Sequence, residues 1–349
     1  MEKVMIAMSG GVDSSVALLL LKDKLNVIGA TLKLIDSQES GIEDAKAVAE
    51  RFNIPFQVFD FRELFRKEVI KRFSSGYLCG ETPNPCVDCN RQIKFKALFE
   101  KANYFNCRYV ATGHYARVEY SNEKGRWLLK KSDCNGRTNP KDQSYVLYNL
   151  TQEQLSRIIF PLGEASKDKV RQLAEKNELI NSNKPDSQDI CFIPDGNYGM
   201  FIRNFENIKI PKGDFIDKDG KVLGTHTGII DYTIGQRRGL GVSAKEPLYV
   251  TAKNASTNTV TLGHGTELMC ASLVACDLNW IAIENLTGEI KAAAKTRYNQ
   301  KEQPCTIKPL DKGRVKVLFD EPQRALAPGQ RAVFYDGDIV IGGGIIAIS

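Results

Sequence analysis

The chain has 349 residues, of which 42% are hydrophobic and 26% charged, and its formal net charge is +6. This length exceeds one ordinary compact core, so we expect two or three domains, and the composition excludes a disordered chain. No apolar run approaches the roughly 20 residues that span a bilayer. The first residues form a strand pattern rather than a signal peptide, which predicts a cytoplasmic protein with no membrane partner.

The first half of the chain alternates short apolar strands with amphipathic helices. The expected strands are residues 4–8, 27–34, 56–59 and 108–111, and the expected helices are residues 14–22, 42–52, 62–73 and 93–105. This alternation predicts an α/β fold with a doubly wound parallel sheet. Ligands of such sheets bind outside the carboxyl ends of the strands, where the glycine turn after Met8 lies.

The second half of the chain changes character near Ile208. Residues 151–177 have a helical pattern, whereas from Pro211 onward short strands and turn residues dominate. We therefore expect an N-terminal nucleotide-binding and catalytic domain over residues 1–207 and a small β-rich domain over residues 208–271. A C-terminal β-barrel or sandwich would cover residues 272–349.

Positive charge is concentrated in one part of the chain. Residues 61–131 contain 15 Lys and Arg against 7 Asp and Glu, a net charge of +8 that exceeds the value for the whole chain. A local excess of this kind suits a polyanion such as RNA. From charge alone, a solvated basic face is an equally good interpretation.

The sharpest motif is Ser9-Gly10-Gly11-Val12-Asp13-Ser14-Ser15, between a strand and a helix. Its glycines let the backbone approach an anion, and the helix N-terminus and the serines supply hydrogen-bond donors. The motif lacks the lysine of a Walker loop and the spacing of a dinucleotide-binding loop. It resembles the pyrophosphatase loop (PP-loop) of enzymes that cleave ATP between the α and β phosphates. Asp13 would hold Mg²⁺ or order the loop.

Three of the nine cysteines stand in segments suited to thiol chemistry. Cys86 and Cys89 lie in a proline-stiffened loop, and Cys89 directly precedes an expected helix start, where the helix dipole lowers a thiol pKa. Cys191 lies about a hundred residues downstream, within residues 186–193. No second Cys-x-x-Cys completes a structural zinc site, which favours redox or sulfur-transfer chemistry. The cysteines interpreted as buried and inert are Cys107, Cys134, Cys270, Cys276 and Cys305.

Taken in order, these segments resemble the tRNA-specific 2-thiouridylase family, MnmA, with a Cys-x-x-Cys form of the active-site loop. The resemblance covers essentially the whole chain. Its markers are residues 9–15, 84–85 with 89–90, 112–117, 141–145, 187–192, 226, 232–240 and 327–330. It implies a PP-loop N-terminal domain of the adenine nucleotide alpha-hydrolase type, a small β middle domain and a C-terminal β-barrel.

The same resemblance implies ATP and Mg²⁺ as cofactors and tRNA as the substrate. The wobble uridine of the Lys, Glu and Gln tRNAs would be flipped out of its stack toward the cysteine loop. The implied ATP contacts are Ala7, Met8, Ser9, Gly10, Gly11, Val12, Asp13, Ser14, Leu32 and Gly113. The implied tRNA contacts are Asn84, Pro85, Cys86, His114, Lys141, Asp142, Gln143, Arg297, Tyr298 and Gln330.

The implied reaction has two stages. The uracil C2 oxygen attacks the α-phosphate of ATP, which releases pyrophosphate and leaves an adenylated base. A persulfide on Cys191, delivered by a cysteine desulfurase or a sulfur-relay protein, then attacks C2 and displaces AMP. Cys89 acts as a nucleophile, either by forming a disulfide with Cys191 or by attacking the base.

Cys86 stands where many members of the family carry Asp, and this opens a second mechanism. Cys86, Cys89 and Cys191 could hold three irons of a 4Fe–4S cluster and leave the fourth iron for hydrosulfide. Two further interpretations keep less of the pattern. One is a PP-loop synthetase acting on a small metabolite, and the other is an RNA-binding protein without turnover.

Overall fold

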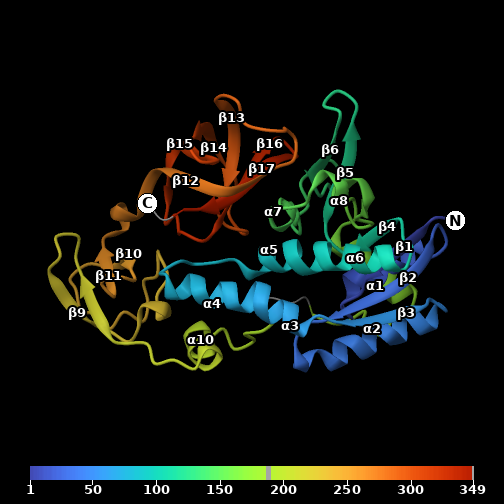
Figure 1. The fold of residues 1–349 in the computed structure, drawn as a ribbon, viewed down its shortest axis with the longest axis horizontal. Helices are drawn as coiled ribbons and strands as arrows, with labels where there is room; N and C mark the ends of the chain where they lie inside the picture. Colours follow the sequence, from blue (N-terminus) through green and yellow to red (C-terminus); the bar gives the residue numbers. More distant parts are fainter. Residues whose placement is uncertain (186–189, 348–349) are drawn as a thin grey trace.

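The computed structural model describes residues 1–185 and 190–347. Figure 1 shows an α/β unit at the N-terminal end, a small β unit at the far end, and a C-terminal barrel above the long helices that run between them. The molecule is therefore elongated, and the long helices lie against all three units. Residues 186–189, the first part of the predicted Cys191 segment, lie outside the described residues.

The α/β unit is built on a five-stranded parallel sheet in the order β3-β2-β1-β4-β7. Its strands are β1 (Lys3–Ala7), β2 (Asn26–Lys33), β3 (Phe56–Asp60), β4 (Tyr109–Thr112) and β7 (Ile158–Ile159). The strand order changes direction at β1, because β2 and β4 pair with its two edges. The carboxyl end of β1 is thus the point where such sheets bind ligands.

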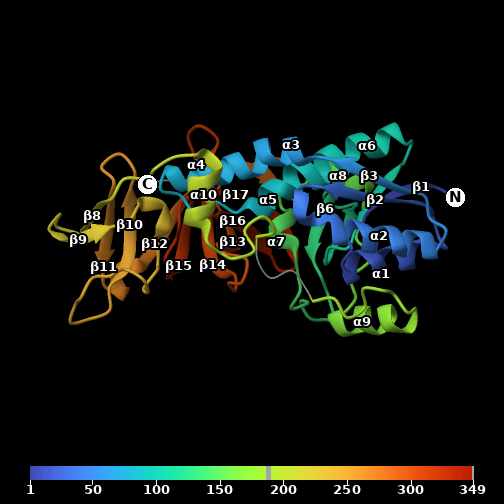
Figure 2. The same ribbon diagram turned by 90° about the horizontal axis from the view of Figure 1, so that it is seen from below.

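Helices cover both faces of this sheet, which confirms the predicted doubly wound fold (Figure 2). Val4 and Ile6 of β1 pack on α1 (Val12–Leu21), α2 (Glu39–Arg51) and α9 (Lys167–Lys176). Met5, between them, packs on the opposite side among residues of the long helices. This division follows from the alternation of side chains along a strand, and both faces of β1 are fully buried.

Two long helices form the opposite layer, and each contains a π-helical segment. The first comprises α3 (Arg62–Phe65), η2 (Arg66–Ile70) and α4 (Lys71–Leu78), and the second α5 (Pro85–Cys89), η3 (Asn90–Ala97) and α6 (Leu98–Tyr104). The prediction that the second helix begins at Ile93 is wrong. It begins at Pro85, because Asn84 caps the N-terminus with its side chain and a proline suits the first helical position.

The prediction of a helical segment through residues 151–177 is also only partly right. The structure has α8 (Gln152–Arg157), then strand β7, then α9. Ile158 and Ile159 join the sheet by pairing with Val110 and Ala111 of β4. Their branched side chains suit a strand, and the pairing partner lies too far along the chain for a local pattern to reveal it.

The remaining two units are built from strands, as predicted. The small sheet has the order β10-β11-β8-β9 and comprises β8 (Gly213–Ile216), β9 (Val222–His226), β10 (Tyr249–Asn254) and β11 (Thr259–Gly263). The C-terminal barrel comprises β12 (Met269–Trp280), β13 (Ile290–Lys295), β14 (Gln303–Leu310), β15 (Arg314–Arg324), β16 (Arg331–Asp336) and β17 (Ile339–Ile346). Pairing of β12 with both β15 and β17 closes this barrel.

A hairpin of the N-terminal half joins the barrel sheet. It consists of β5 (Ala116–Ser121) and β6 (Arg126–Lys131), and Lys130 of β6 pairs with Ile339 of β17. The shorter helices are α7 (Ser144–Leu147), α10 (Tyr198–Glu206), η1 (Asp36–Gln38), η4 (Ile229–Asp231) and η5 (Gly265–Leu268). The hairpin makes the barrel an immediate neighbour of the α/β unit.

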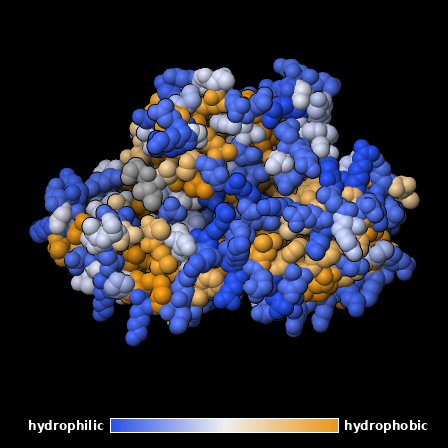
Figure 3. Space-filling view, in the orientation of Figure 1, coloured by the Kyte–Doolittle hydropathy of each residue, from blue (hydrophilic) through white to orange (hydrophobic). Residues whose placement is uncertain are grey.

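The face drawn in Figure 3 is mostly hydrophilic, with hydrophobic residues in separate patches. Within residues 1–185 and 190–347, no helix combines the length and apolar character that crossing a membrane requires.

Candidate active site

The nucleotide loop adopts a conformation that only glycine allows at its tightest point. Gly10 has φ +74°, and a Cβ there would lie 2.2 Å from the carbonyl oxygen of Gly41. The serines fold inward: Ser14 Oγ donates to the Gly11 carbonyl over 3.0 Å and accepts from the Ser9 N–H over 3.2 Å. Gly11 is the N-cap residue of α1, and the N–H groups of the first helical turn have no partner within the helix. This arrangement suits binding of a phosphate chain.

The other residues expected at ATP lie around the same edge of the sheet. Gly113 follows β4, and a Cβ there would lie 2.7 Å from the Ser14 nitrogen, so β4 and the start of α1 meet without a side chain between them. Thr31 Oγ1 donates to the Met8 carbonyl over 2.7 Å and fixes the end of β1 against β2. Leu32 continues β2 and is buried.

Asp13 is held by two neighbouring side chains. Lys167 Nζ lies 2.8 and 2.9 Å from its two carboxylate oxygens, and the Tyr115 hydroxyl donates to Oδ1 over 2.7 Å. These contacts fit the loop-ordering role of Asp13. Asn181 adds a further support, because its Nδ2 donates to the Gly10 carbonyl and to Ser15 Oγ.

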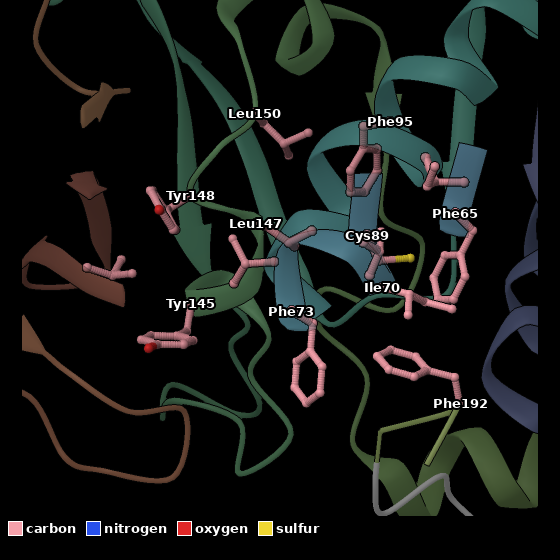
Figure 4. Close-up of a cluster of buried hydrophobic side chains, with 14 of the residues drawn as sticks. Phe65, Ile70, Phe73, Cys89, Phe95, Tyr145, Leu147, Tyr148, Leu150 and Phe192 are labelled. Carbon is pink, nitrogen blue, oxygen red and sulfur yellow. The ribbon is translucent and has the colours of Figure 1, made fainter. Parts of the chain in front are cut away.

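Cys89 lies in the apolar core between the two long helices. Its side chain lies among those of Phe65, Ile70 and Phe95 in Figure 4, and the residue is only 8% exposed. Burial raises the pKa of its thiol to about 12. The predicted low pKa is therefore wrong, because burial decides the pKa. Cys89 also lies at the end of α5 and does not precede a helix start.

Cys86 and Cys191 lie close enough to Cys89 for their charges to act on it. Each raises the pKa of the Cys89 thiol, and Cys86 also raises that of Cys191. Both are exposed, yet the surrounding protein still removes enough water to raise the pKa of each. The charge on Lys94 opposes these shifts at all three thiols. The three predicted cysteines thus lie within electrostatic reach of one another and of Lys94.

Phe192 anchors the segment that carries Cys191. Its ring centroid lies 5.6 Å from that of Phe65 and 5.5 Å from that of Phe73, both in edge-on contacts. Figure 4 shows its ring beside the side chains of Phe73 and Ile70, in the same cluster as Cys89. This packing explains how a residue distant in sequence comes near the cysteine loop.

Cys86, Cys89 and Cys191 are also predicted as possible ligands of a 4Fe–4S cluster. Among the residues that the structure describes, no group of three or more His, Cys, Asp or Glu is placed to hold a metal ion. The 4Fe–4S cluster on Cys86, Cys89 and Cys191 therefore stays a prediction.

The cysteines expected to be inert differ in burial. Cys107 and Cys305 are 3% and 1% exposed, as expected. The expectation of full burial is wrong for the half-buried Cys134, Cys270 and Cys276. A ninth cysteine, Cys79, is exposed at the end of α4.

Two of the predicted tRNA residues shape the start of the cysteine helix. Asn84 Oδ1 accepts from the Cys86 and Val87 N–H groups over 3.2 and 3.4 Å. Pro85 occupies the next position and is buried. These two residues therefore fix the direction in which Cys86 leaves the loop.

Two other predicted tRNA residues, Tyr298 and Asp142, contact each other. Tyr298 is 36% exposed, and its hydroxyl donates to the Asp142 carbonyl over 3.2 Å. Burial raises the pKa of this tyrosine to about 12, and the charges of Asp142 and Cys86 add to the shift. Asp142 is buried and accepts from Ser132 and Ser144, whereas Lys141 is exposed.

Three predicted residues are held by backbone groups or by burial. Gln143 Oε1 accepts from the Tyr115 N–H, and Arg297 donates to the Ala325 carbonyl over 2.7 Å. His114 is 8% exposed between two aromatic rings, and burial holds its pKa well below the ordinary value. His114 is therefore neutral in the folded protein near pH 7.

Gln330 connects the barrel to the cysteine loop, and the next residue makes a contact that the sequence did not reveal. Gln330 Nε2 donates to the Thr82 carbonyl over 2.9 Å. Arg331 forms a buried ion pair with Asp88, between the two cysteines of α5. Arg331 follows the predicted marker 327–330, and Asp88 precedes the marker 89–90. The acidic residue inside Cys-x-x-Cys was the signal in the sequence that could have indicated this ion pair.

Three family profiles match consecutive parts of the chain. The tRNA methyl transferase HUP domain matches residues 2–195, and the tRNA methyl transferase PRC-barrel domain matches residues 200–264. The aminomethyltransferase beta-barrel domain matches residues 271–346. The order of the profiles follows the α/β unit, the small sheet and the barrel.

Whole-length relatives narrow the family. The chain is 49% identical to tRNA-specific 2-thiouridylase MnmA 2 of Caldanaerobacter subterraneus subsp. tengcongensis, over 99% of this chain and 98% of the relative. It is 47% identical to tRNA-specific 2-thiouridylase MnmA of Clostridioides difficile, over the same shares. Among solved structures, the U34-tRNA thiolase NcsA from Methanococcus maripaludis matches 59% of this chain and 72% of its own at 20% identity, with a TM-score of 0.37. On the strength of the whole-length relatives, the chain belongs to the tRNA-specific 2-thiouridylase MnmA family, a family of tRNA sulfurtransferases.

Proposed function

We propose that this protein is an ATP-dependent 2-thiouridylase that acts on the wobble uridine, position 34, of the tRNAs for Lys, Glu and Gln. The observation that supports the proposal is the whole-length similarity to relatives named tRNA-specific 2-thiouridylase. In addition, Cys86, Cys89 and Cys191 lie within electrostatic reach of one another, in the same unit as the nucleotide loop. An adenylating synthetase for a small metabolite has no use for three converging thiols.

The first stage activates the base. The uracil C2 oxygen attacks the α-phosphate of ATP, pyrophosphate leaves, and the oxygen becomes part of an adenylate. The N–H groups at the start of α1 would stabilise the negative charge on the phosphates, with Mg²⁺ accompanying ATP. Activation is needed because a carbonyl oxygen is a poor leaving group, whereas AMP is a good one.

The second stage transfers sulfur. Cys191 is exposed, which suits delivery of a persulfide by a cysteine desulfurase or a relay protein. The terminal sulfur attacks C2 and displaces AMP, which leaves the base joined to Cys191 through a disulfide. The Cys89 thiolate then attacks Cys191 Sγ, the bond to the C2 sulfur breaks, and 2-thiouridine leaves with that electron pair. A thiol reductant must afterwards restore the Cys89–Cys191 disulfide to two thiols.

Cys89 has to leave its resting environment for this step. Its thiol is buried and has a pKa of about 12, so almost none of it is thiolate near pH 7. Direct attack of Cys89 on the base would require the same change. We therefore expect tRNA binding to rearrange the segment that carries Cys86 and Cys89.

The test uses anaerobically purified protein with ATP, Mg²⁺, unmodified tRNA, and a cysteine desulfurase with cysteine. Iron content and the ultraviolet–visible spectrum are recorded, and digested tRNA is searched for 2-thiouridine by mass. Thiolation by iron-free protein, lost in Cys89→Ser and Cys191→Ser, is the expected result. Thiolation only with iron and a cluster absorbance would overturn the persulfide route. Absence of 2-thiouridine under both conditions would overturn the function in favour of a metabolite synthetase.

A further inference from the structure

The helix that carries Cys86 and Cys89 is held by a charge from the C-terminal barrel. Arg331, the first residue of β16, places its Nη2 2.9 Å from Oδ1 of Asp88. The two side chains are 4% and 8% exposed, and 243 positions separate them in the chain. Asp88 immediately precedes Cys89, so this pair acts on the turn of α5 that carries the thiol.

The same barrel segment also contacts Thr82, which precedes the two cysteines of α5. The Thr82 N–H donates to the Pro328 carbonyl over 2.8 Å, and Gln330 donates to the Thr82 carbonyl over 2.9 Å. Gly329 has φ +85°, and a Cβ there would lie 2.8 Å from Cβ of Glu81. Residues 328–331, here called the barrel loop, therefore contact residues 81, 82 and 88, on both sides of Cys86.

Arg331 also connects these two sets of contacts. Its Nη1 donates to the Gly329 carbonyl over 2.7 Å while its Nη2 holds Asp88. The planar guanidinium fixes these two directions at once, which a lysine cannot do. A buried ion pair contributes little to stability when compared with apolar residues, but it specifies one arrangement because each charge needs its partner.

We propose that Asp88 and Arg331 are positioning residues that make the placement of the Cys89 thiol depend on the barrel. The inference rests on the proposed function, in which Cys89 must leave its buried site during sulfur transfer. The barrel loop holds that site closed in the resting protein, and a displacement of the barrel by bound tRNA would be transmitted to α5 through this pair.

The test compares three proteins by alkylation with iodoacetamide, followed by mass spectrometry of each cysteine. One is the wild type, and the second is the double variant Asp88→Asn with Arg331→Gln, which removes both charges and leaves no unpaired ion buried. The matched control is Arg117→Gln with Asp338→Asn, which removes another ion pair between the N-terminal half and the barrel. Arg331→Lys serves as a conservative second variant.

We expect Cys89 in the double variant to react at least tenfold faster than in the wild type, and the control to stay within twofold. Arg331→Lys should give an intermediate rate. With tRNA and ATP, the double variant should release pyrophosphate normally but form at least fivefold less 2-thiouridine per pyrophosphate. If the double variant or Arg331→Lys is folded and its Cys89 is alkylated within twofold of the wild-type rate, the proposal is overturned. Failure of the wild type to thiolate would instead overturn the proposed function, and the alkylation result would still decide the coupling.

Discussion

The alkylation rate of Cys89 measures how strongly burial suppresses ionisation of its thiol. The perturbation is exposure of the native protein to iodoacetamide at pH 8, with the urea-unfolded chain as the reference. A free cysteine with a pKa of about 8.5 is roughly a quarter thiolate at pH 8, whereas a pKa of about 12 leaves about one part in 10⁴. Ionisation alone should therefore make native Cys89 about 10³-fold slower than unfolded Cys89.

The dependence on pH gives the sign of the effect. Because the folded pKa lies above the unfolded one, the native rate should rise about tenfold for each pH unit from 8 to 10, while the unfolded rate levels off above pH 9. The same shift means that the stability from the neutral thiol is complete below about pH 9 and is lost as the pH rises toward 12.

Site-resolved mass spectrometry of quenched samples supplies the rates, and Cys86 in the same digest is the internal control. Cys86 is exposed on the same helix and should react faster than Cys89. The reasoning fails if native Cys89 reacts within tenfold of the unfolded rate at pH 8, or if its native profile levels off by pH 9.

Three further outcomes follow from the geometry. Gly10→Ala should weaken ATP binding at least tenfold by calorimetry, because its Cβ would meet the Gly41 carbonyl, whereas Gly125→Ala, also at positive φ but with open space around it, should bind normally. Asn84→Ala should cost about 1 kcal/mol in urea unfolding through the lost cap, and Asn84→Asp should restore most of it. Burial lowers the pKa of Lys253 to about 8, so between pH 7 and pH 9 the wild type should gain about 1 kcal/mol of unfolding free energy relative to Lys253→Met. No gain, or a loss, would refute that assignment.

Local patterns in the sequence were enough for the α/β sheet and the nucleotide loop. Apolar runs separated by amphipathic helices predict the sheet, and two glycines between a strand and a helix predict a tight turn at its carboxyl edge. The conformation of Gly10 and the close approach of Gly113 agree with the spacing of their motifs. These features depend on neighbours in the chain, which a sequence displays directly.

Features that depend on distant partners were missed. Strand β7 has two residues and exists only through its pairing with β4. The pKa of Cys89 was predicted in the wrong direction because the deciding factor is burial among distant aromatic side chains, not the helix dipole. The pairing of Asp88 with Arg331 bridges most of the chain, so neither residue alone indicates it.

The barrel loop also has a consequence for protein synthesis. Residues that form the nucleotide loop, the cysteine helix and the Cys191 segment all leave the ribosome before Arg331, which reaches Asp88 from near the end of the described chain. Domains fold in the order in which they are made. A nascent or truncated chain can therefore have a formed nucleotide loop while its cysteine helix still lacks the barrel contacts. Because Arg331 is made after the cysteine helix, full control of Cys89 requires that the barrel has also been synthesised.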